Sequence, residues 1–439
     1  MTDVLTEFET KPSQPHWCFD GSMFWVTDAK GNWVNLDKSS FSDYLICNPF
    51  QQFAGFKEEG QSISPADKEK LRTMVDGRVA YAGPLAGWNK GFQRFEDTDA
   101  LITKSPTLMK PEAGTWQIFY DFLAGLMGHD KKQMESFLFW CKHTLEALYE
   151  GRPRLGLALV LAGEAGCGKT LLKEFVREMF GGREVYPYAY MMGKDNFNRE
   201  LTESPLWVID DEAAETSLQG RIKFGAEVKK VVANSAMRCR GMHQNGITLS
   251  PLRRLCICVN VEPDRLLVLP PIDDDIADKM LICKCDHPEK WPMPMGTHDQ
   301  KTRFFQAVKK ELPAFIHQML EADIPDEYRG RFGVRHYHHP DVVESLMSIS
   351  PEYQMAEQID RALFGSLLTD KWEGSTHTLY QDVLKSNQLT SREMDKFPQA
   401  AWIGRRLSKL ADRFPALYQC THTKNGNVWT IHKKGGSES

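Results

Sequence analysis

The run Leu155-Gly-Leu-Ala-Leu-Val-Leu-Ala-Gly-Glu-Ala-Gly-Cys-Gly-Lys-Thr170 decides the fold of this 439-residue chain. Its first half is apolar and has the length of a buried strand. Its second half, from Gly163 to Thr170, matches the pattern GxxxxGK[ST] in full. Apolar residues then recur at helical spacing over 171–180, and Gly181-Gly182 end that pattern. The sequence therefore predicts a strand, a glycine-rich loop and a helix in direct succession.

A loop of this composition suits the phosphates of a nucleotide. Its glycines let backbone N–H groups wrap around phosphate oxygens, and the next helix adds the positive end of its dipole. Lys169 would reach the β- and γ-phosphates, and the Thr170 hydroxyl would hold Mg²⁺, so we expect ATP and Mg²⁺ as cofactors. The residues expected to bind the nucleotide are Gly163, Glu164, Ala165, Gly166, Cys167, Gly168, Lys169, Thr170 and Leu171.

A second apolar run, Leu206-Trp-Val-Ile-Asp-Asp-Glu212, ends in three acids. A nucleotide-hydrolysing site of this kind needs one carboxylate for Mg²⁺ and often a second to orient the attacking water. Asp210 is the expected magnesium-side acid, and either Asp211 or Glu212 is the expected base. Spacing does not choose between these two. The expected metal ligands are thus Thr170, Asp210 and Asp211.

A third apolar run, Leu255-Cys-Ile-Cys-Val-Asn260, ends in a polar residue. In a parallel sheet the carboxyl tip of a strand faces the ligand crevice. We interpret Asn260 as the residue that senses the γ-phosphate or positions water, whereas an isolated asparagine at a strand end is often a turn former. Because strands and helical segments alternate over 155–285, the sequence predicts an α/β domain with a mostly parallel sheet.

The order of these three motifs, closed by Asn260, resembles superfamily 3 helicases, in particular the helicase half of phage, plasmid and poxvirus-type primase-helicases. The resemblance is strongest over 155–285 and weaker over 80–150, where Gly114-Thr-Trp116 lies. It implies a hexameric ring that uses ATP with Mg²⁺ and travels 3′-to-5′ on single-stranded or forked DNA. The implied function is that of an ATP-dependent replicative DNA helicase of a phage, plasmid or other mobile element.

Patterns along the chain set the expected domain organisation. We expect an irregular region with short strands at 1–110, a helical pre-motor region at 111–150, an AAA+-like P-loop ATPase domain at 151–330 and a helical, winged-helix-like module at 331–439. The residues before the motor show no carboxylate pair arranged for nucleotidyl transfer. We therefore expect a helicase without a primase, with priming and other replication proteins supplied by separate chains.

In this family a hairpin that touches DNA lies between the second and third motifs. Here residues 219–254 hold eight basic residues and one acid, with a turn signal at Asn245-Gly246. Cations in such a hairpin would contact phosphates without reading sequence. The alternative is a solvated basic face. The residues expected to contact nucleic acid are Lys229, Lys230, Arg238, Arg240 and His243.

The chain departs from the family pattern at one position. The family commonly has an arginine after the third strand that reaches the γ-phosphate of a neighbouring subunit, and Lys279 occupies that place. Lysine supplies charge but not a bidentate fork. Three explanations stay open: Lys279 acts in trans, Arg253 or Arg254 does so, or hydrolysis is slow.

The C-terminal sequence predicts a small module. Residues 401–415 have helical periodicity, and Leu417–Thr421 would pair with Val428–Ile431 across Asn425-Gly426. Helices followed by a hairpin are typical of a winged helix. Between Arg405 and Lys434 there are seven cations and one acid, so both a DNA-binding wing and a packing role fit.

Composition bounds the alternatives. The chain is 41% hydrophobic, carries a net charge of −5 and has ten scattered cysteines. It has no apolar stretch long enough for a membrane span and no secretory signal pattern, so we expect a cytoplasmic protein without a membrane partner. Two other functions stay open. One is another DNA-associated P-loop ATPase, such as a packaging motor or a defence switch, and the other is an ATP-gated, non-catalytic DNA-binding initiator.

Overall fold

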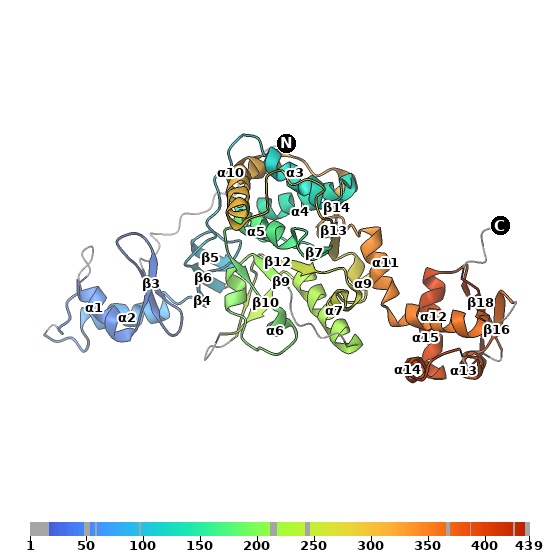
Figure 1. Cartoon of the computed structure of the whole chain (residues 1–439). Helices are drawn as coiled ribbons and strands as arrows, with labels where there is room; N and C mark the ends of the chain where they lie inside the picture. The colour runs from blue at the N-terminus through green and yellow to red at the C-terminus, as the bar shows by residue number, and fades with distance from the viewer. Residues whose placement is uncertain are drawn as a thin grey trace, which may run out of the picture. The chain divides into compact units, whose positions relative to one another are not determined.

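The computed structural model describes residues 17–47, 53–57, 59–95, 98–210, 217–241, 246–365, 369–386, 388–424 and 426–434 (Figure 1). The chain divides into two compact units. The first unit comprises Met1–Ala213, Lys223–Val259 and Asp274–Tyr337, and the second comprises Ala214–Ile222, Asn260–Asp273 and His338–Ser439. Among the described residues, none of the helices has the length and apolar character needed to cross a membrane.

A parallel five-stranded sheet forms the centre of the first unit. Its strand order is β13-β7-β12-β9-β8, and every neighbouring pair runs parallel. The three central strands are almost wholly buried, as expected when helices cover both faces of a sheet. This arrangement confirms the predicted α/β class with a parallel sheet. The strands are β7 (Ala158–Gly163), β8 (Glu184–Val185), β9 (Leu206–Asp210), β12 (Arg254–Val259) and β13 (Met280–Cys285).

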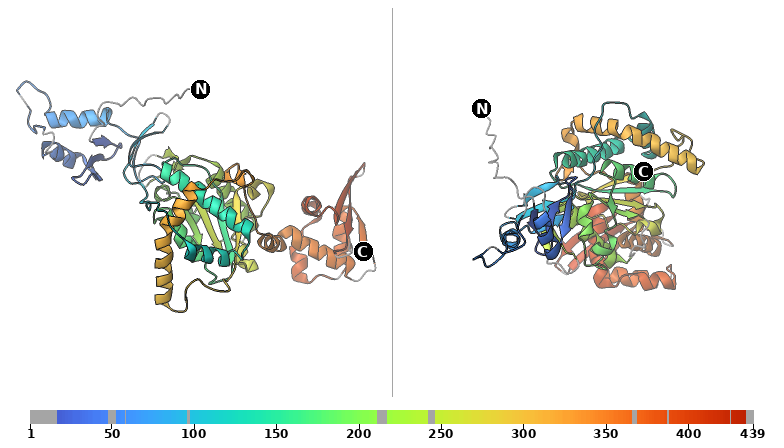
Figure 2. Two further views of the ribbon diagram at one scale, coloured as in Figure 1. Left: turned by 90° about the horizontal axis from the view of Figure 1, so that it is seen from above. Right: turned by 90° about the vertical axis from the view of Figure 1, so that its left-hand side faces the viewer.

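Helices cover this sheet. Helix α10 contacts α3, α4 and α5, and α5 also contacts strands β7 and β12 (Figure 2). Helix α4 begins where the Asp130 side chain accepts a hydrogen bond from the Gln133 N–H, and it ends at Gly151 in the left-handed region. The main helices are α3 (Gln117–Leu126), α4 (Lys131–Glu150), α5 (Lys169–Met179), α7 (Leu218–Ala233) and α10 (His298–Glu321).

The N-terminal part of the chain contains two further three-stranded sheets. The first is antiparallel and packs around Phe24 and Phe41, whose rings stack 4.1 Å apart. The second has the order β4-β6-β5, with β4 and β6 parallel. The sequence predicted short strands in an otherwise irregular region, but not the two sheets. The pairing of strands in a sheet can join separate segments of the chain, and local patterns do not report it. The elements are β1 (Trp17–Phe19), β2 (Phe24–Thr27), β3 (Trp33–Leu36), α1 (Lys38–Cys47), α2 (Pro65–Val75), β4 (Tyr81–Gly83), β5 (Gly91–Phe95) and β6 (Thr98–Ile102).

The predicted basic hairpin is present as an antiparallel pair of short strands, β10 (Met237–Cys239) and β11 (Ile247–Leu249). Cys239 and Leu249 are buried in one cluster with Tyr81 and Ile102 of the β4-β6-β5 sheet. A two-stranded hairpin of this length is not stable alone. Its inward side chains therefore anchor it on the N-terminal strands.

The second unit ends in a compact module. Its three-stranded sheet has the antiparallel order β16-β18-β17, and its core includes Ile403, Leu407 and Trp429. The predicted helix and hairpin are confirmed, whereas β16 was not expected. The elements are α11 (Pro340–Ser348), α12 (Pro351–Phe364), β16 (Lys371–Gly374), α13 (Thr376–Lys385), α14 (Ser391–Lys396), α15 (Ala400–Arg413), β17 (Tyr418–Thr423) and β18 (Gly426–His432).

Short elements complete the described chain. In the first unit they are α6 (Tyr188–Met191), the 3₁₀ helix η1 (Glu200–Glu203), α9 (Asp274–Ala277), the 3₁₀ helix η2 (Asp326–Tyr328), β14 (Arg329–Gly330) and β15 (Gly333–Val334). In the second unit there is α8 (Pro263–Leu266).

Candidate active site

The glycine-rich loop (Gly163–Gly168) connects the carboxyl end of β7 to the first residue of α5. Gly166 and Gly168 have φ angles of 80° and 118°, in the left-handed region that other residues rarely adopt. Gly163 is required for a different reason. A Cβ atom there would overlap the carbonyl oxygen of Cys285 on the adjacent strand β13. Backbone torsions and close strand packing therefore both select glycine in this loop.

The Lys169 side chain turns back into the glycine-rich loop. Its Nζ donates hydrogen bonds to the carbonyl oxygens of Gly163 and Glu164, each over 2.7 Å, and lies 3.8 Å from the Cys167 sulfur. The residue is only 7% exposed. The ammonium is thus held inside the curve of the loop at the N-terminus of α5, where positive potential favours an anion.

Thr170 and Asp210 lie at the same edge of the sheet. Thr170 is exposed in the first turn of α5. Asp210 ends β9 and is in register with Cys258 of β12, which in turn pairs with Leu161 of β7. A hydroxyl and a carboxylate are oxygen ligands of the kind that Mg²⁺ prefers. Asp211 and Glu212 lie outside the described residues, so the choice of base stays a prediction.

Asn260 directly follows β12, whose last residue Val259 pairs with Ala162 of β7. The strand therefore ends at the edge of the sheet from which the glycine-rich loop departs. Asn260 itself belongs to the second unit, and its role at the nucleotide stays a prediction.

A cavity of about 400 Å³ adjoins the glycine-rich loop. Besides residues of the loop and α5, its lining includes Trp291, Met295 and Lys301, from the segment between β13 and α10 and the first turn of α10. Sequence reasoning missed these residues, because an isolated tryptophan among prolines and methionines carries no periodic signal. The lining residues are Gly166, Gly168, Lys169, Thr170, Leu171, Trp291, Met295 and Lys301.

The basic hairpin presents Arg238 and Arg240 to solvent. The buried amide of Asn198 holds their backbone, because its nitrogen donates to the Arg238 carbonyl over 2.8 Å and its oxygen accepts from the Arg240 N–H over 2.7 Å. The Asn198 N–H also donates to the Arg240 carbonyl, over 3.1 Å. Asn198 was not among the predicted residues. His243 lies outside the described residues.

The other two predicted nucleic-acid contacts, Lys229 and Lys230, lie on α7 and form ion pairs. Lys229 Nζ lies 3.2 Å from the Asp275 carboxylate, and Lys230 Nζ lies 2.6 Å from that of Glu227. Exposed pairs of this kind contribute little free energy. A polyanion can therefore compete for both lysines.

Lys279 is engaged within its own chain. Its Nζ donates to the Asp275 carbonyl over 2.6 Å and to the Asp278 carboxylate over 2.5 Å, and its side chain is 12% exposed. The alternatives, Arg253 and Arg254, are buried at the amino end of β12, the end opposite the glycine-rich loop. Lys279 lies at this same end of the sheet, because it directly precedes β13 and its carbonyl accepts a hydrogen bond from the Ala158 N–H of β7. Position therefore does not choose among the three residues, and the one that acts in trans stays a prediction.

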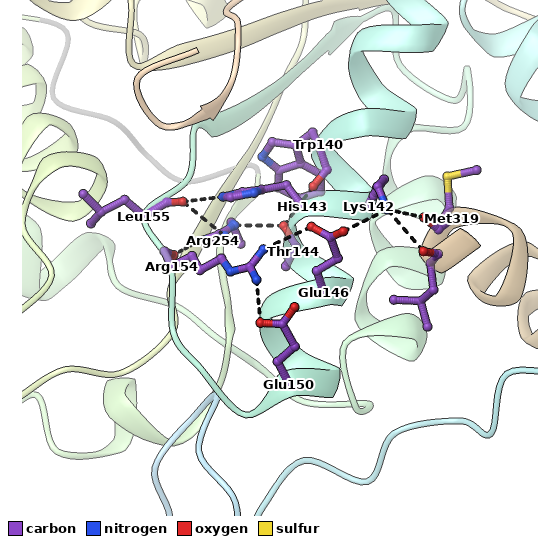
Figure 3. A network of polar contacts seen from close by, with 11 residues as sticks. Trp140, Lys142, His143, Thr144, Glu146, Glu150, Arg154, Leu155, Arg254 and Met319 are labelled. Atoms are coloured by element: carbon purple, nitrogen blue, oxygen red, sulfur yellow. Dashed lines mark hydrogen bonds and ion pairs between the residues drawn. The ribbon is translucent and has the colours of Figure 1, made fainter. Parts of the chain in front are cut away.

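A buried polar network fixes the start of β7 (Figure 3). Trp140 Nε1 and His143 Nε2, both on α4, bond the carbonyl oxygens of Leu157 and Leu155 over 2.8 and 2.7 Å. Arg254 Nη1 donates to the Arg154 carbonyl over 2.9 Å. The same helix thus sets where the strand enters the sheet, and so where the glycine-rich loop begins.

Burial changes the pKa of two groups in this network. It lowers the pKa of His143 to about 4, with the charge of Arg254 as the next cause. It also lowers the pKa of the Arg254 guanidinium to about 9. At neutral pH, His143 is therefore neutral and Arg254 is charged.

Comparison with known proteins shows what this arrangement is similar to. A family of unknown function, DUF5906, matches residues 161–275. A search of curated protein sequences found no match. The A form apo structure of the NrS-1 C-terminal region is similar, with 12% identity and a TM-score of 0.57 over 95% of this chain and 96% of that chain. A second apo structure of that region gives the same identity and TM-score, over 95% of each chain.

The JCV helicase structure matches 54% of this chain and 60% of that chain, with 10% identity and a TM-score of 0.27. That likeness is too slight to carry an argument. At 12% identity, the NrS-1 likeness shows the fold alone. Nearly the whole chain therefore shares the fold of the NrS-1 C-terminal region.

Proposed function

We propose that the chain is an ATP-dependent DNA helicase of superfamily 3 type. The single observation that carries the proposal is the glycine-rich loop, with the Lys169 ammonium held inside it at the N-terminus of an amphipathic helix. This combination of backbone N–H groups, helix dipole and buried cation suits a polyphosphate. The DNA-dependent part of the proposal rests on the basic hairpin and on the resemblance of the three motifs.

Each predicted site residue has a proposed part in ATP hydrolysis. The loop amides and Lys169 bind and orient the β- and γ-phosphates. Thr170 and Asp210 would hold Mg²⁺, which when bound neutralises charge on the phosphate oxygens. Asp211 or Glu212 orients the attacking water, and Asn260 contacts the γ-phosphate. Lys279 would supply positive charge to the nucleotide of a neighbouring subunit in a ring.

The basic hairpin is the proposed contact with single-stranded DNA. Arg238 and Arg240 are exposed, and Asn198 fixes the backbone from which their side chains extend. Contacts of guanidinium groups with phosphates are independent of sequence, as translocation requires. Hydrolysis would shift the hairpin and draw one strand through a hexameric ring. Any primase or other replication protein would be a separate partner.

For the C-terminal module we infer a winged-helix arrangement. Helix, strand, three helices and a strand pair follow each other from α12 to β18, and the first strand, β16, pairs with the last. In this arrangement α15 would be the recognition helix. Trp402 is 57% exposed on α15, and Arg405 lies over its ring at 5.5 Å. Exposed aromatic and guanidinium groups suit nucleic acid, although a packing role fits the same fold.

Strand displacement on a forked DNA duplex with ATP and Mg²⁺, run beside Lys169→Ala, tests the proposal. We expect unwinding by the wild type and none by the variant. ATP hydrolysis without displacement would instead support another DNA-associated ATPase, such as a packaging motor or a defence switch. Binding of ATP and DNA without hydrolysis would support an ATP-gated initiator.

A further inference from the structure

The cavity beside the glycine-rich loop extends beyond the phosphate-binding residues. At about 400 Å³ it falls in the range of small-molecule sites, roughly 300–1,000 Å³. Part of its lining is the loop and the start of α5, and the rest, here called the wall, is Trp291, Met295 and Lys301. A nucleotide whose phosphates are held at Lys169 would have its remaining part in this cavity, beside the wall.

Trp291 is held in a fixed orientation. Its ring stacks on Phe122, with centroids 5.8 Å apart and planes 23° apart, and it meets Phe304 edge-on at 6.1 Å. Phe122 and Phe304 are fully buried, whereas Trp291 is half-buried and lines the cavity. A ring fixed on one side by buried aromatics and open to a cavity on another is preorganised for a ligand.

The ring also lies against the start of α5. A Cβ atom on Gly168 would come within 3.3 Å of both Trp291 Cη2 and Phe122 Cε2. Glycine at this position therefore allows both the left-handed backbone torsion of the loop and the close contact with Trp291. The approach places the indole edge next to the residue that precedes Lys169.

The chemistry of this wall suits a flat aromatic group. An indole ring stacks on a nucleobase, and a methionine thioether makes favourable contacts with aromatic rings. Lys301 adds an exposed cation at the same wall. Leu171 of α5 adds an apolar side chain to the lining of the cavity.

We propose that the Trp291–Met295 wall binds the base of the nucleotide whose phosphates occupy the glycine-rich loop, with Trp291 as the stacking partner. This inference rests on the proposed ATPase function and names the residues that hold the nucleoside half of its substrate. Stacking on an aromatic side chain strengthens binding of a base by roughly five- to 100-fold.

Binding of two probes to the full chain tests the inference. Isothermal titration calorimetry with Mg²⁺ compares ADP, which carries a base, with inorganic tripolyphosphate, which does not. Trp291→Leu keeps an apolar side chain and removes the ring. We expect about five- to 100-fold weaker ADP binding and unchanged tripolyphosphate binding. Unchanged ADP binding would overturn the inference, and so would an equal loss for both probes, since Trp291 would then only support the loop.

Two variants serve as controls. Trp33→Leu changes a tryptophan of β3 that packs on Phe92 and does not line the cavity, so both affinities should match the wild type. Lys169→Ala should weaken both probes. A wild type that binds neither probe would overturn the ATPase function and the base site together. Normal hydrolysis with no effect of Trp291→Leu on ADP would overturn the base site alone.

Trp291 also packs on buried aromatics, so a melting temperature without ligand is measured for each variant. Trp291→Phe keeps a ring and provides a second measurement if Trp291→Leu does not fold. We expect ADP, but not tripolyphosphate, to quench the tryptophan emission of the wild type, and Trp291→Phe to abolish that difference. An ADP-specific quench that persists in Trp291→Phe would place the base elsewhere.

Discussion

Arg254 Nε donates a hydrogen bond to Thr144 Oγ1 over 2.8 Å, which fixes the first residue of β12 to the middle of α4. Arg254 is 1% exposed, and no carboxylate of the described residues lies within ion-pair distance of it. Its charge is instead solvated by Thr144 and by the carbonyl oxygens of Arg154 and Arg253. Loss of any one acceptor leaves part of a buried cation without a partner, and that is costly.

Thr144→Val tests this bond with almost no change of shape. The variant keeps the side-chain volume but removes the acceptor for Arg254 Nε, so the free energy of unfolding should fall by about 1.5–3 kcal/mol. Thr144→Ser, which retains the hydroxyl, should recover most of that loss. Urea unfolding followed by tryptophan emission measures both. A Thr144→Val variant as stable as the wild type would show that the bond is energetically neutral.

The stability of the first unit should depend on pH through His143. Its folded pKa is about 4, below the unfolded value of about 6.5, so the unfolded chain binds more protons between these values. The free energy of unfolding should therefore fall by up to about 1.4 kcal/mol per pH unit as pH drops from about 6.5 towards 4. It should show no contribution from His143 above pH ~7.

His143→Gln provides the matched measurement, because a glutamine amide can donate to the Leu155 carbonyl without titrating. The variant should lose this part of the acid sensitivity, while the exposed His377→Gln should follow the wild type. Identical pH profiles for His143→Gln and the wild type would contradict the assignment.

Gly163→Ala should destabilise the sheet. The added methyl group would overlap the Cys285 carbonyl oxygen. The backbone must shift to make room, which should lower the free energy of unfolding by about 1–3 kcal/mol or more. Gly404→Ala is the control, because a Cβ there has 3.4 Å to its nearest neighbour, on Thr376, and alanine is the better helix former. We expect a lower urea midpoint for the first and an unchanged or higher one for the second. A lower urea midpoint for Gly404→Ala than for Gly163→Ala would show that β13 moves easily to accommodate the methyl group.

Arg238→Gln and Arg240→Gln should each weaken binding of single-stranded DNA uniformly across sequences. If each guanidinium releases about one counterion, each variant should reduce the slope of log K against log salt by roughly 0.7. Arg329→Gln removes an exposed cation outside the basic hairpin and should leave the slope unchanged. Fluorescence anisotropy over a salt series measures all three. An unchanged slope in the hairpin variants would mean that this surface is merely solvated.

The predictable parts of this fold are those with local signals. Apolar runs ending in Gly163 and Asp210 predicted β7 and β9, and the apolar residues at helical spacing after Thr170 predicted α5. Strand β16 (Lys-Trp-Glu-Gly) contains no comparable apolar run, and its residues are alternately exposed and half-exposed. The strand is defined by its antiparallel pairing with β18. In the N-terminal region the sequence does predict short strands, and β2 and β3 form there. The pairing of β4 with β6 joins separate segments and was not predicted.

The candidate site divides in the same way. Lys169 and Thr170 follow from a motif, because phosphate binding imposes their spacing. Trp291 does not, because its position depends on how the segment after β13 packs on Phe122 and Gly168. The Thr144–Arg254 bond joins residues 110 positions apart, and no local pattern reports such a pair.

The backbone is held tightly where it enters strand β7 and is free to adjust where it leaves the strand. The segment entering it is bonded to α4 through Trp140 and His143, whereas its exit runs into glycines at 166 and 168 with few steric limits on their torsions. Amide hydrogens near Leu159 should therefore exchange with solvent only on global opening, and those of the loop should exchange through local fluctuations. A ligand can then select a loop conformation without deforming the protein interior. Ligand binding therefore depends on one end of this short strand, and the stability of the fold depends on the other.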